Sequence, residues 1–244
     1  MKLFLLLPFL LSFVSYSQNE SSKVFKTREY YPLINTDFNQ LVQTFSVIQD
    51  DSTFLYKIKY EKEIRKKDTF IVTTTYSTTG EINMTIKEKI TRKGMRFHSG
   101  TAYKFNEKKN RFEDFEIKGR KSISFPFKTL EKNEQTTFKY TNHYDHKLKF
   151  KSNCRFVFVD TTRLNYSYDS SPTLVFIRDV HFKQSKNFFK KKTRYSYTSY
   201  LIPNQGICYY SKKPLYSSRR KNAILYQDSL DQLLKGTLEK SEFK

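Results

Sequence analysis

The stretch that decides the fold is INMTIKEKI, residues 82–90. Apolar side chains occupy every second position of this stretch except one: Ile82, Met84, Ile86 and Ile90. Successive side chains of a β-strand point to opposite faces of the sheet, so this period of two predicts a strand with one buried face and one solvated face. Glu88 interrupts the apolar row, and we interpret it as a sign that the sheet ends nearby.

The same alternation continues on both sides of this strand, from Phe54 to Phe105. Two rows of larger side chains precede it: Phe54, Tyr56, Ile58 and Tyr60, and then Phe70, Val72, Thr74 and Tyr76. Thr79-Gly80 and Gly94 supply turns between the predicted strands. Sequential strands joined by short turns pair antiparallel, and an antiparallel sheet can leave one face in water.

The second half of the chain repeats this theme. Strands that are apolar on both faces are predicted around Phe156–Val159 and Leu174–Ile177, and Pro203–Gly206 reads as the turn of a β-hairpin. A sheet with this many strands curls or splits into two layers. We therefore predict a mainly β (α+β) fold: one large curved antiparallel sheet or incomplete barrel, with a short helix near each end.

Spacings of three and four residues predict the two helices. The first begins at Thr36 or Asp37 and ends at Asp50, and its apolar stripe is Phe38, Leu41, Val42, Phe45 and Ile48. The second runs from Ala223 to Leu238, and its stripe is Tyr226, Leu230, Leu233 and Leu234. The first stripe is expected to lie on the apolar face of the sheet that follows.

The amino terminus is typical of a secretory signal peptide. Lys2 precedes an apolar run from Leu3 to Val14, and Ser15 and Ser17 stand at the −3 and −1 positions of a cleavage site. The alternative is a membrane anchor, for which the run is short. We therefore expect a signal peptide at 1–17 and a single exported β-rich domain at 18–244, in the periplasm, at the outer surface or in the medium.

The chain is strongly basic. Its formal net charge is +21, and removal of the signal peptide with Lys2 leaves 21 − 1 = +20. Such a charge favours anionic partners such as a membrane or glycan surface, whereas export argues against nucleic acid. The alternative is that the lysines are spread over the solvent-facing strand positions.

One segment concentrates basic residues around Phe188 and Phe189 without any acidic residue. Its members are Lys183, Lys186, Lys190, Lys191, Lys192 and Arg194. A basic loop with exposed aromatic side chains can bind anionic lipid headgroups or glycans. The alternative, which the sequence favours, is a solvated hairpin whose two phenylalanines pack inward.

Two cysteines, Cys154 and Cys208, remain in the mature chain. In an oxidising compartment a lone pair often forms a disulfide, so we predict a bridge between them, with two buried thiols as the alternative.

The sequence predicts no catalytic, cofactor-binding or metal-binding residues. His143, Asp145 and His146 form the densest group of metal-ligating types, but a strand sends His146 to the opposite face from the other two. No G-x-S-x-G elbow, S-x-x-K motif or glycine-rich phosphate loop is present. These histidines therefore read as ordinary surface residues.

The main functional hypothesis is an exported, non-catalytic binding protein that carries an apolar or amphiphilic ligand, such as a lipid, on the curved sheet. The predicted plan, an amphipathic helix followed by long antiparallel strands, resembles that of periplasmic lipoprotein-carrier and lipocalin-like folds, and this analogy of architecture carries no residues over. The alternatives are a secreted hydrolase whose site has no recognisable motif and an outer-membrane-associated β protein. A buried polar group of residues facing a cleft would favour the hydrolase.

Overall fold

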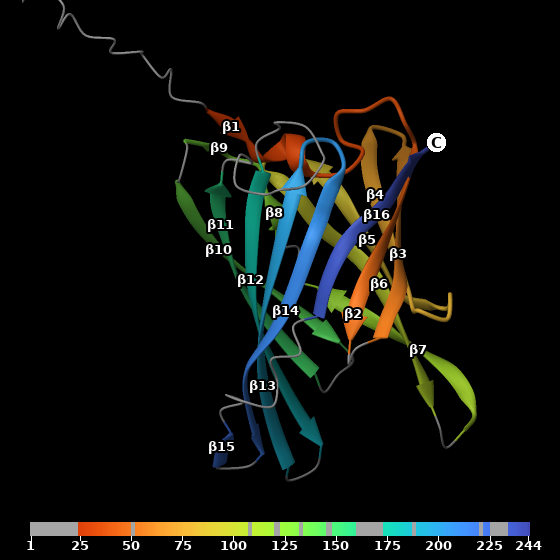
Figure 1. The fold of residues 1–244 in the computed structure, drawn as a ribbon, viewed down its shortest axis with the longest axis vertical. Helices are drawn as coiled ribbons and strands as arrows, with labels where there is room; N and C mark the ends of the chain where they lie inside the picture. Colours follow the sequence, from red (N-terminus) through yellow and green to blue (C-terminus); the bar gives the residue numbers. More distant parts are fainter. Residues whose placement is uncertain are drawn as a thin grey trace, which may run out of the picture.

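The computed structural model describes residues 24–49, 52–106, 109–119, 123–131, 134–144, 148–159, 173–186, 189–219, 222–224 and 234–244. The chain folds into one large antiparallel sheet and a two-stranded sheet (Figure 1). This architecture confirms the predicted mainly β fold. No helix in these residues is long and apolar enough to cross a membrane.

The strands of the large sheet follow one another along the chain with few departures from sequence order. They are β2 (Gln40–Gln49), β3 (Ser52–Arg65), β4 (Asp68–Tyr76), β5 (Ile82–Thr91), β6 (Gly94–Asn106), β7 (Arg111–Gly119), β8 (Ile123–Pro126), β10 (Gln135–Tyr144), β11 (Leu148–Val159), β12 (Thr173–Lys186), β13 (Phe189–Ile202), β14 (Gly206–Arg219), β15 (Asn222–Ile224) and β16 (Leu234–Phe243). The small sheet pairs β1 (Phe25–Lys26) with β9 (Thr129–Leu130).

The large sheet curls back towards itself and forms an incomplete barrel. Its spatial order is β13-β12-β11-β10-β7-β6-β5-β4-β3-β2-β16-β14-β15, and β13 also pairs with β14. The wall is not closed along its whole length, because β10 pairs with β7 only from Asn142 to Tyr144. The short strand β8 pairs with β6 beside this seam.

The alternation in β5 is confirmed. Met84, Ile86 and Glu88 line the interior of the curved sheet, whereas Lys87 and Lys89 form ion pairs with Glu63 and Asp68 on the outer face. Lys89 Nζ lies 2.7 Å from Asp68 Oδ2. Glu88 lies near the end of β5 at Thr91, as its place in the apolar row suggested, and it is buried inside the sheet.

In β4 the inward row is the one with the threonines. Ile71, Thr73 and Thr75 pair with the inward residues of β5, so Phe70 points outward. There the Phe70 ring lies 4.7 Å from Lys87 Nζ and 5.1 Å from the His98 ring. These neighbours bury Phe70 to 6% exposure on the outer face, which explains how a phenylalanine is tolerated there.

The first predicted helix is wrong, because residues 40–49 form strand β2. Leu41, Gln43 and Phe45 are each fully buried in one row of this strand. Gln43 places a polar side chain in that row, where its Nε2 donates to the carbonyl oxygen of Ile207 at 3.0 Å. This polar position hides the period of two, so the remaining apolar residues imitate a helical stripe.

The second predicted helix is also wrong at both of its ends. Residues 222–224 form β15 and residues 234–243 form β16, while 225–233 lie outside the described residues. Strand β16 pairs with β2 on one side and β14 on the other, and this ladder satisfies the backbone groups that a helix would have bonded internally. The helix observed near the amino terminus is the single 3₁₀ turn Thr27–Tyr30.

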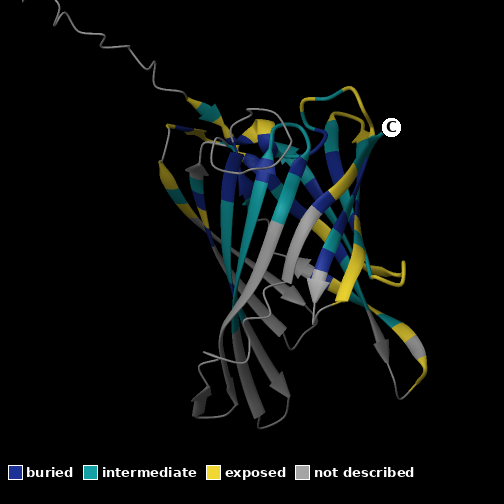
Figure 2. Cartoon of the chain, in the orientation of Figure 1, coloured by how far each residue is buried: buried dark blue, intermediate teal, exposed yellow. Residues whose placement is uncertain are grey.

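The segment from Thr27 to Phe38 covers one end of the barrel, beside β1 and β9 (Figure 1). Tyr30 and Leu33 belong to the main core cluster together with residues of β2, β3 and β11. The backbone nitrogen of Asn204 donates to the carbonyl oxygen of Glu29 at 2.7 Å. Among the described residues, buried positions gather towards this covered end (Figure 2).

Candidate functional site

A pocket of about 340 Å³ lies inside the curved sheet, next to the covered end. Its walls come from β3, β4, β5, β6 and β8 and from β12, β13 and β14, and Tyr31 and Pro32 contribute from the amino-terminal segment. The apolar lining consists of Pro32, Ile58, Met84, Ile86, Phe97, Phe125, Phe176, Leu201 and Ile207. The polar lining consists of Tyr31, Tyr56, Tyr60, Thr73, Thr75, Glu88, Ser124, Arg178, Tyr197 and Ser199.

Packed aromatic rings form the wall near β8. The Phe125 ring lies 5.3 Å from Tyr31 and 5.8 Å from Phe176, both in edge-on geometry. Behind them Phe156 is fully buried, 4.8 Å from Phe176 in a stacked arrangement and 5.2 Å from Phe125. Ring pairs of this kind are stabilising beyond the area that they bury. They make this wall a rigid apolar surface.

A carboxyl group forms one polar point of the pocket. The hydroxyls of Tyr31 and Ser124 both donate to the carboxylate of Glu88, one to each oxygen. Ser124 Oγ also lies 3.1 Å from the carbonyl oxygen of Met95. Burial raises the pKa of Glu88, and the hydrogen bonds from Ser124 and Tyr31 offset this in part. The site therefore favours the protonated acid more than water does.

The neighbouring tyrosines share this environment. Burial raises the pKa of Tyr31 well above its usual value, and the nearby Glu88 carboxylate adds to the effect. Burial also raises the pKa of Tyr56 and of Tyr60. These phenols are therefore neutral hydrogen-bonding groups at physiological pH.

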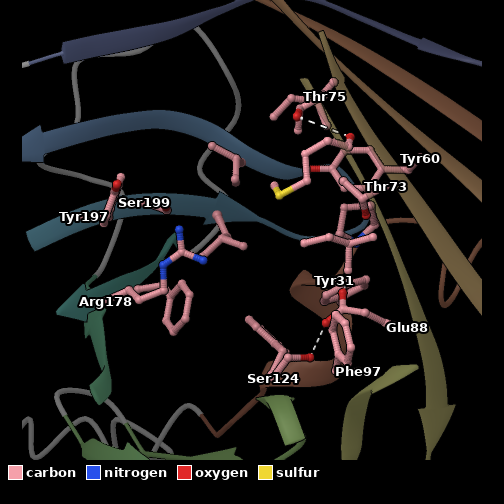
Figure 3. A pocket seen from close by; sticks show the side chains of 18 of the residues that line it. Tyr31, Tyr60, Thr73, Thr75, Glu88, Phe97, Ser124, Arg178, Tyr197 and Ser199 are labelled. Atoms are coloured by element: carbon pink, nitrogen blue, oxygen red, sulfur yellow. Dashed lines mark hydrogen bonds between the residues drawn. The ribbon is translucent and has the colours of Figure 1, made fainter. Parts of the chain in front are cut away.

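Arg178 forms the second polar point, on the opposite wall. It projects from β12, and its guanidinium carbon lies 5.0 Å from the centre of the Tyr197 ring on the neighbouring strand β13. Figure 3 shows Arg178 and Glu88 on opposite sides of the pocket, with apolar side chains between them. The nearby positive charge lowers the pKa of Glu88 as a minor contribution beside burial.

The pocket has few charged side chains. Within the described part of the chain, its lining includes Glu88 and Arg178 but no histidine, cysteine, aspartate or lysine. The pocket combines a broad apolar surface with two fixed polar points, as small-molecule binding sites do.

The predicted basic residues lie away from this pocket. Strands β12 and β13 form a hairpin in which Lys183 pairs with Lys192 and Lys186 pairs with Phe189. The side chains of Lys183, Lys186, Lys190, Lys191 and Lys192 lie outside the described residues. Arg194 forms an ion pair with Asp179, with 3.6 Å between their atoms. The binding of an anionic surface by this hairpin remains a prediction.

The predicted disulfide is wrong, because Cys154 and Cys208 are not bonded to each other. Cys154 lies on β11 and Cys208 on β14, and strands β12 and β13 stand between them. Neighbouring strands are about 4.8 Å apart, so three spacings amount to roughly 14 Å along the sheet. A disulfide requires Cα atoms within about 7 Å of each other.

No described group of three or more ligating side chains could hold a metal ion. His143 lies on β10, while Asp145 and His146, like the predicted signal peptide, lie outside the described residues.

Sequence reasoning did not find Glu88, Arg178, Tyr31 or Ser124 as site residues. The signal for Glu88 was present, because it is the one charged residue in the apolar row of the clearest strand. A charge at an inward position must be buried, and a buried charge needs partners. Arg178 gave a similar signal in an apolar strand, but only the fold places the two residues in one pocket.

Comparisons with known proteins do not show a family for this chain. No family model matches the sequence, and no curated protein matches it. Among solved structures, the fold is similar to a Bacteroides fragilis protein that is described as exported and as having a YmcC-like fold. The two sequences are 8% identical, the match covers 88% of this chain and 99% of that one, and the TM-score is 0.42. A likeness of this size carries no argument about function.

Proposed function

We propose that this chain is an exported, non-catalytic binding protein that holds an apolar or amphiphilic small molecule in the pocket inside its curved sheet. The observation that supports this most directly is the lining of the pocket. Aromatic and aliphatic side chains form most of its surface, and the polar groups at Glu88 and Arg178 lie on opposite walls.

The size of the pocket supports a ligand. The volume of about 340 Å³ lies within the range of roughly 300–1,000 Å³ that small-molecule sites occupy. An apolar ligand of that size would gain dispersion contacts with the lining.

Export is supported by the amino-terminal sequence, where Lys2, the apolar run from Leu3 to Val14 and Ser15 to Ser17 follow the order of a secretory signal peptide. Outside the cytoplasm, a carrier of an apolar molecule needs an apolar pocket that shields the molecule from water.

The buried carboxyl makes a secreted hydrolase the second candidate function. A carboxyl with a raised pKa that faces a pocket can act as a general acid. However, the Glu88 carboxyl already accepts two hydrogen bonds from the protein, which is the arrangement of a positioned structural group. Recovery of an unmodified ligand would separate the two candidates.

The test is native mass spectrometry of residues 18–244, purified from an exporting host. The variant Ser199→Phe places a ring on the pocket wall, and Thr198→Phe places the same ring at the next position of β13, where side chains point to the other face. We expect a lipid-sized adduct that disappears on denaturation in the wild type and Thr198→Phe, but not in Ser199→Phe.

A ligand-free mass for the wild type, or an adduct that persists in Ser199→Phe, would contradict binding in this pocket. A bound molecule that is recovered in cleaved form would favour the hydrolase.

A further inference from the structure

We propose that the pocket selects single-chain amphiphiles with an anionic oxyacid headgroup, carboxylate or phosphate, which Arg178 binds while the chain lies along the apolar walls. This inference rests on the proposed binding function and adds the class of ligand to it.

Arg178 places a positive charge inside the pocket. Arg178 is a pocket residue on β12, in a row that also contains Phe176, so its side chain extends into the interior. The face of the Tyr197 ring supports the guanidinium at 5.0 Å. A guanidinium that stacks on an aromatic ring is oriented by it and still presents a planar fork of N–H donors at its edge. That fork matches two oxygens of a carboxylate or a phosphate.

The other charged residue of the pocket, Glu88, does not supply the same interaction. Its carboxyl is on the other wall, where Tyr31 and Ser124 donate to both of its oxygens (Figure 3). Burial favours the neutral form of this acid, because it raises the pKa of Glu88. Both Glu88 oxygens already accept hydrogen bonds from the protein, so Arg178 is the positively charged group that an anionic headgroup can meet in the described lining.

Apolar side chains surround the arginine in the pocket. Within the described lining, Arg178 is the one basic residue. Phe176 lies on the same strand, Leu201 on the neighbouring strand β13, and Ile207 on β14 beyond it. A wholly polar anion would gain nothing from these residues. A ligand that carries both an acidic headgroup and a hydrocarbon chain uses the arginine and the apolar walls together.

The experiment measures the dissociation constants of four sixteen-carbon probes by native mass spectrometry of the delipidated mature chain: hexadecanoate, hexadecyl phosphate, hexadecanol and hexadecyltrimethylammonium. We expect the wild type to bind at least one of the two anions about tenfold or more tightly than the alcohol, and the cation more weakly than either anion. The tighter anion identifies the headgroup chemistry. Equal affinities for the anions and the alcohol would overturn the inference.

Variants assign the preference to one residue. We expect Arg178→Gln to bring the better anion to within about threefold of the alcohol, because the charge-assisted hydrogen bonds are lost. The matched control Arg155→Gln removes the same charge from an exposed position on the neighbouring strand β11, and it should retain the preference of the wild type. An unchanged preference in Arg178→Gln would refute the role of this residue.

The comparison of headgroups in the wild type needs no variant, so it stands even if Arg178→Gln does not fold. The two proposals also fail in different ways. If no sixteen-carbon probe binds, the proposed function itself fails for ligands of this length. If the alcohol binds as tightly as the anions, the pocket binds apolar chains and only the inference about the headgroup is wrong.

Discussion

The hydrogen bond from Tyr31 to Glu88 joins the amino-terminal segment to the wall of the pocket, and a double-mutant cycle can measure its strength. The change Tyr31→Phe removes the hydroxyl and keeps the ring that packs 5.3 Å from Phe125. Glu88 is 9% exposed, so water cannot readily replace the lost donor. A hydrogen bond to an ionised group contributes about 1.5–3 kcal/mol, and a bond between neutral groups about 0.5–1.5 kcal/mol.

We therefore expect Tyr31→Phe to lower the free energy of unfolding by about 1–3 kcal/mol, with the larger loss at alkaline pH, where more of Glu88 is ionised. In a Glu88→Leu background the acceptor is gone, and the same change should cost less than about 0.5 kcal/mol. The assay is urea unfolding followed by circular dichroism, with all four proteins at the same pH values.

Tyr103→Phe serves as the control, because Tyr103 follows the inward residue Ala102 on β6 and points to the other face. Its effect should be the same in both backgrounds, since the effects of separate, non-contacting sites add. If Tyr31→Phe lowers the free energy of unfolding equally in both backgrounds, to within about 0.3 kcal/mol, the hydrogen bond between Tyr31 and Glu88 contributes nothing to stability.

Three further outcomes are expected. Because folding raises the pKa of Glu88, the contribution of this group to stability is complete below its pKa in the unfolded chain and declines as the pH rises through its folded pKa. Urea unfolding across this pH range should therefore show the wild type losing stability relative to Glu88→Gln as the pH rises. Parallel curves of stability against pH for the two proteins would contradict this. Phe156→Ala should lower the free energy of unfolding by about 3–5 kcal/mol in the same assay, because the Phe156 ring is fully buried. The control Phe54→Ala, at a position with 39% exposure, should lower it by less than about 1 kcal/mol. Similar losses for the two variants would refute the assignment of the aromatic wall. The denatured chain of residues 18–244 should have the mass expected for two free thiols at Cys154 and Cys208, and a mass lower by two hydrogens would show that a disulfide is present. Burial raises the pKa of Cys208 to about 11, so this thiol should react slowly with iodoacetamide at neutral pH in the folded protein.

The strands with a clean alternation could be predicted from the sequence, and β5 is the clearest case. Its neighbour β2 could not, because Gln43 occupies an inward position and breaks the period of two. In β4 the sequence gives no indication of which row is buried, since phenylalanine lies in one row and isoleucine with threonines in the other. The choice depends on the partners Lys87 and His98 that cover Phe70 from outside.

The candidate site depends even more on the fold. Glu88 and Arg178 belong to strands that are far apart both in the sequence and in the order of the sheet, and they face one another because the sheet curls. No local pattern encodes that meeting. The charged residue in an apolar row was nevertheless visible, and a requirement that every inward charge have a partner would have selected Glu88 as a residue to explain.

The position of β16 between β2 and β14 has a consequence for how the chain reaches this fold. Strand β2 stands near the start of the described chain and β16 at its end, so their pairing closes a very long loop. Contacts at such separations make folding slow. Until β16 arrives, β2 and β14 each present an open edge that can pair with other chains. Truncation before Leu234 should therefore leave a protein that aggregates through those two edges.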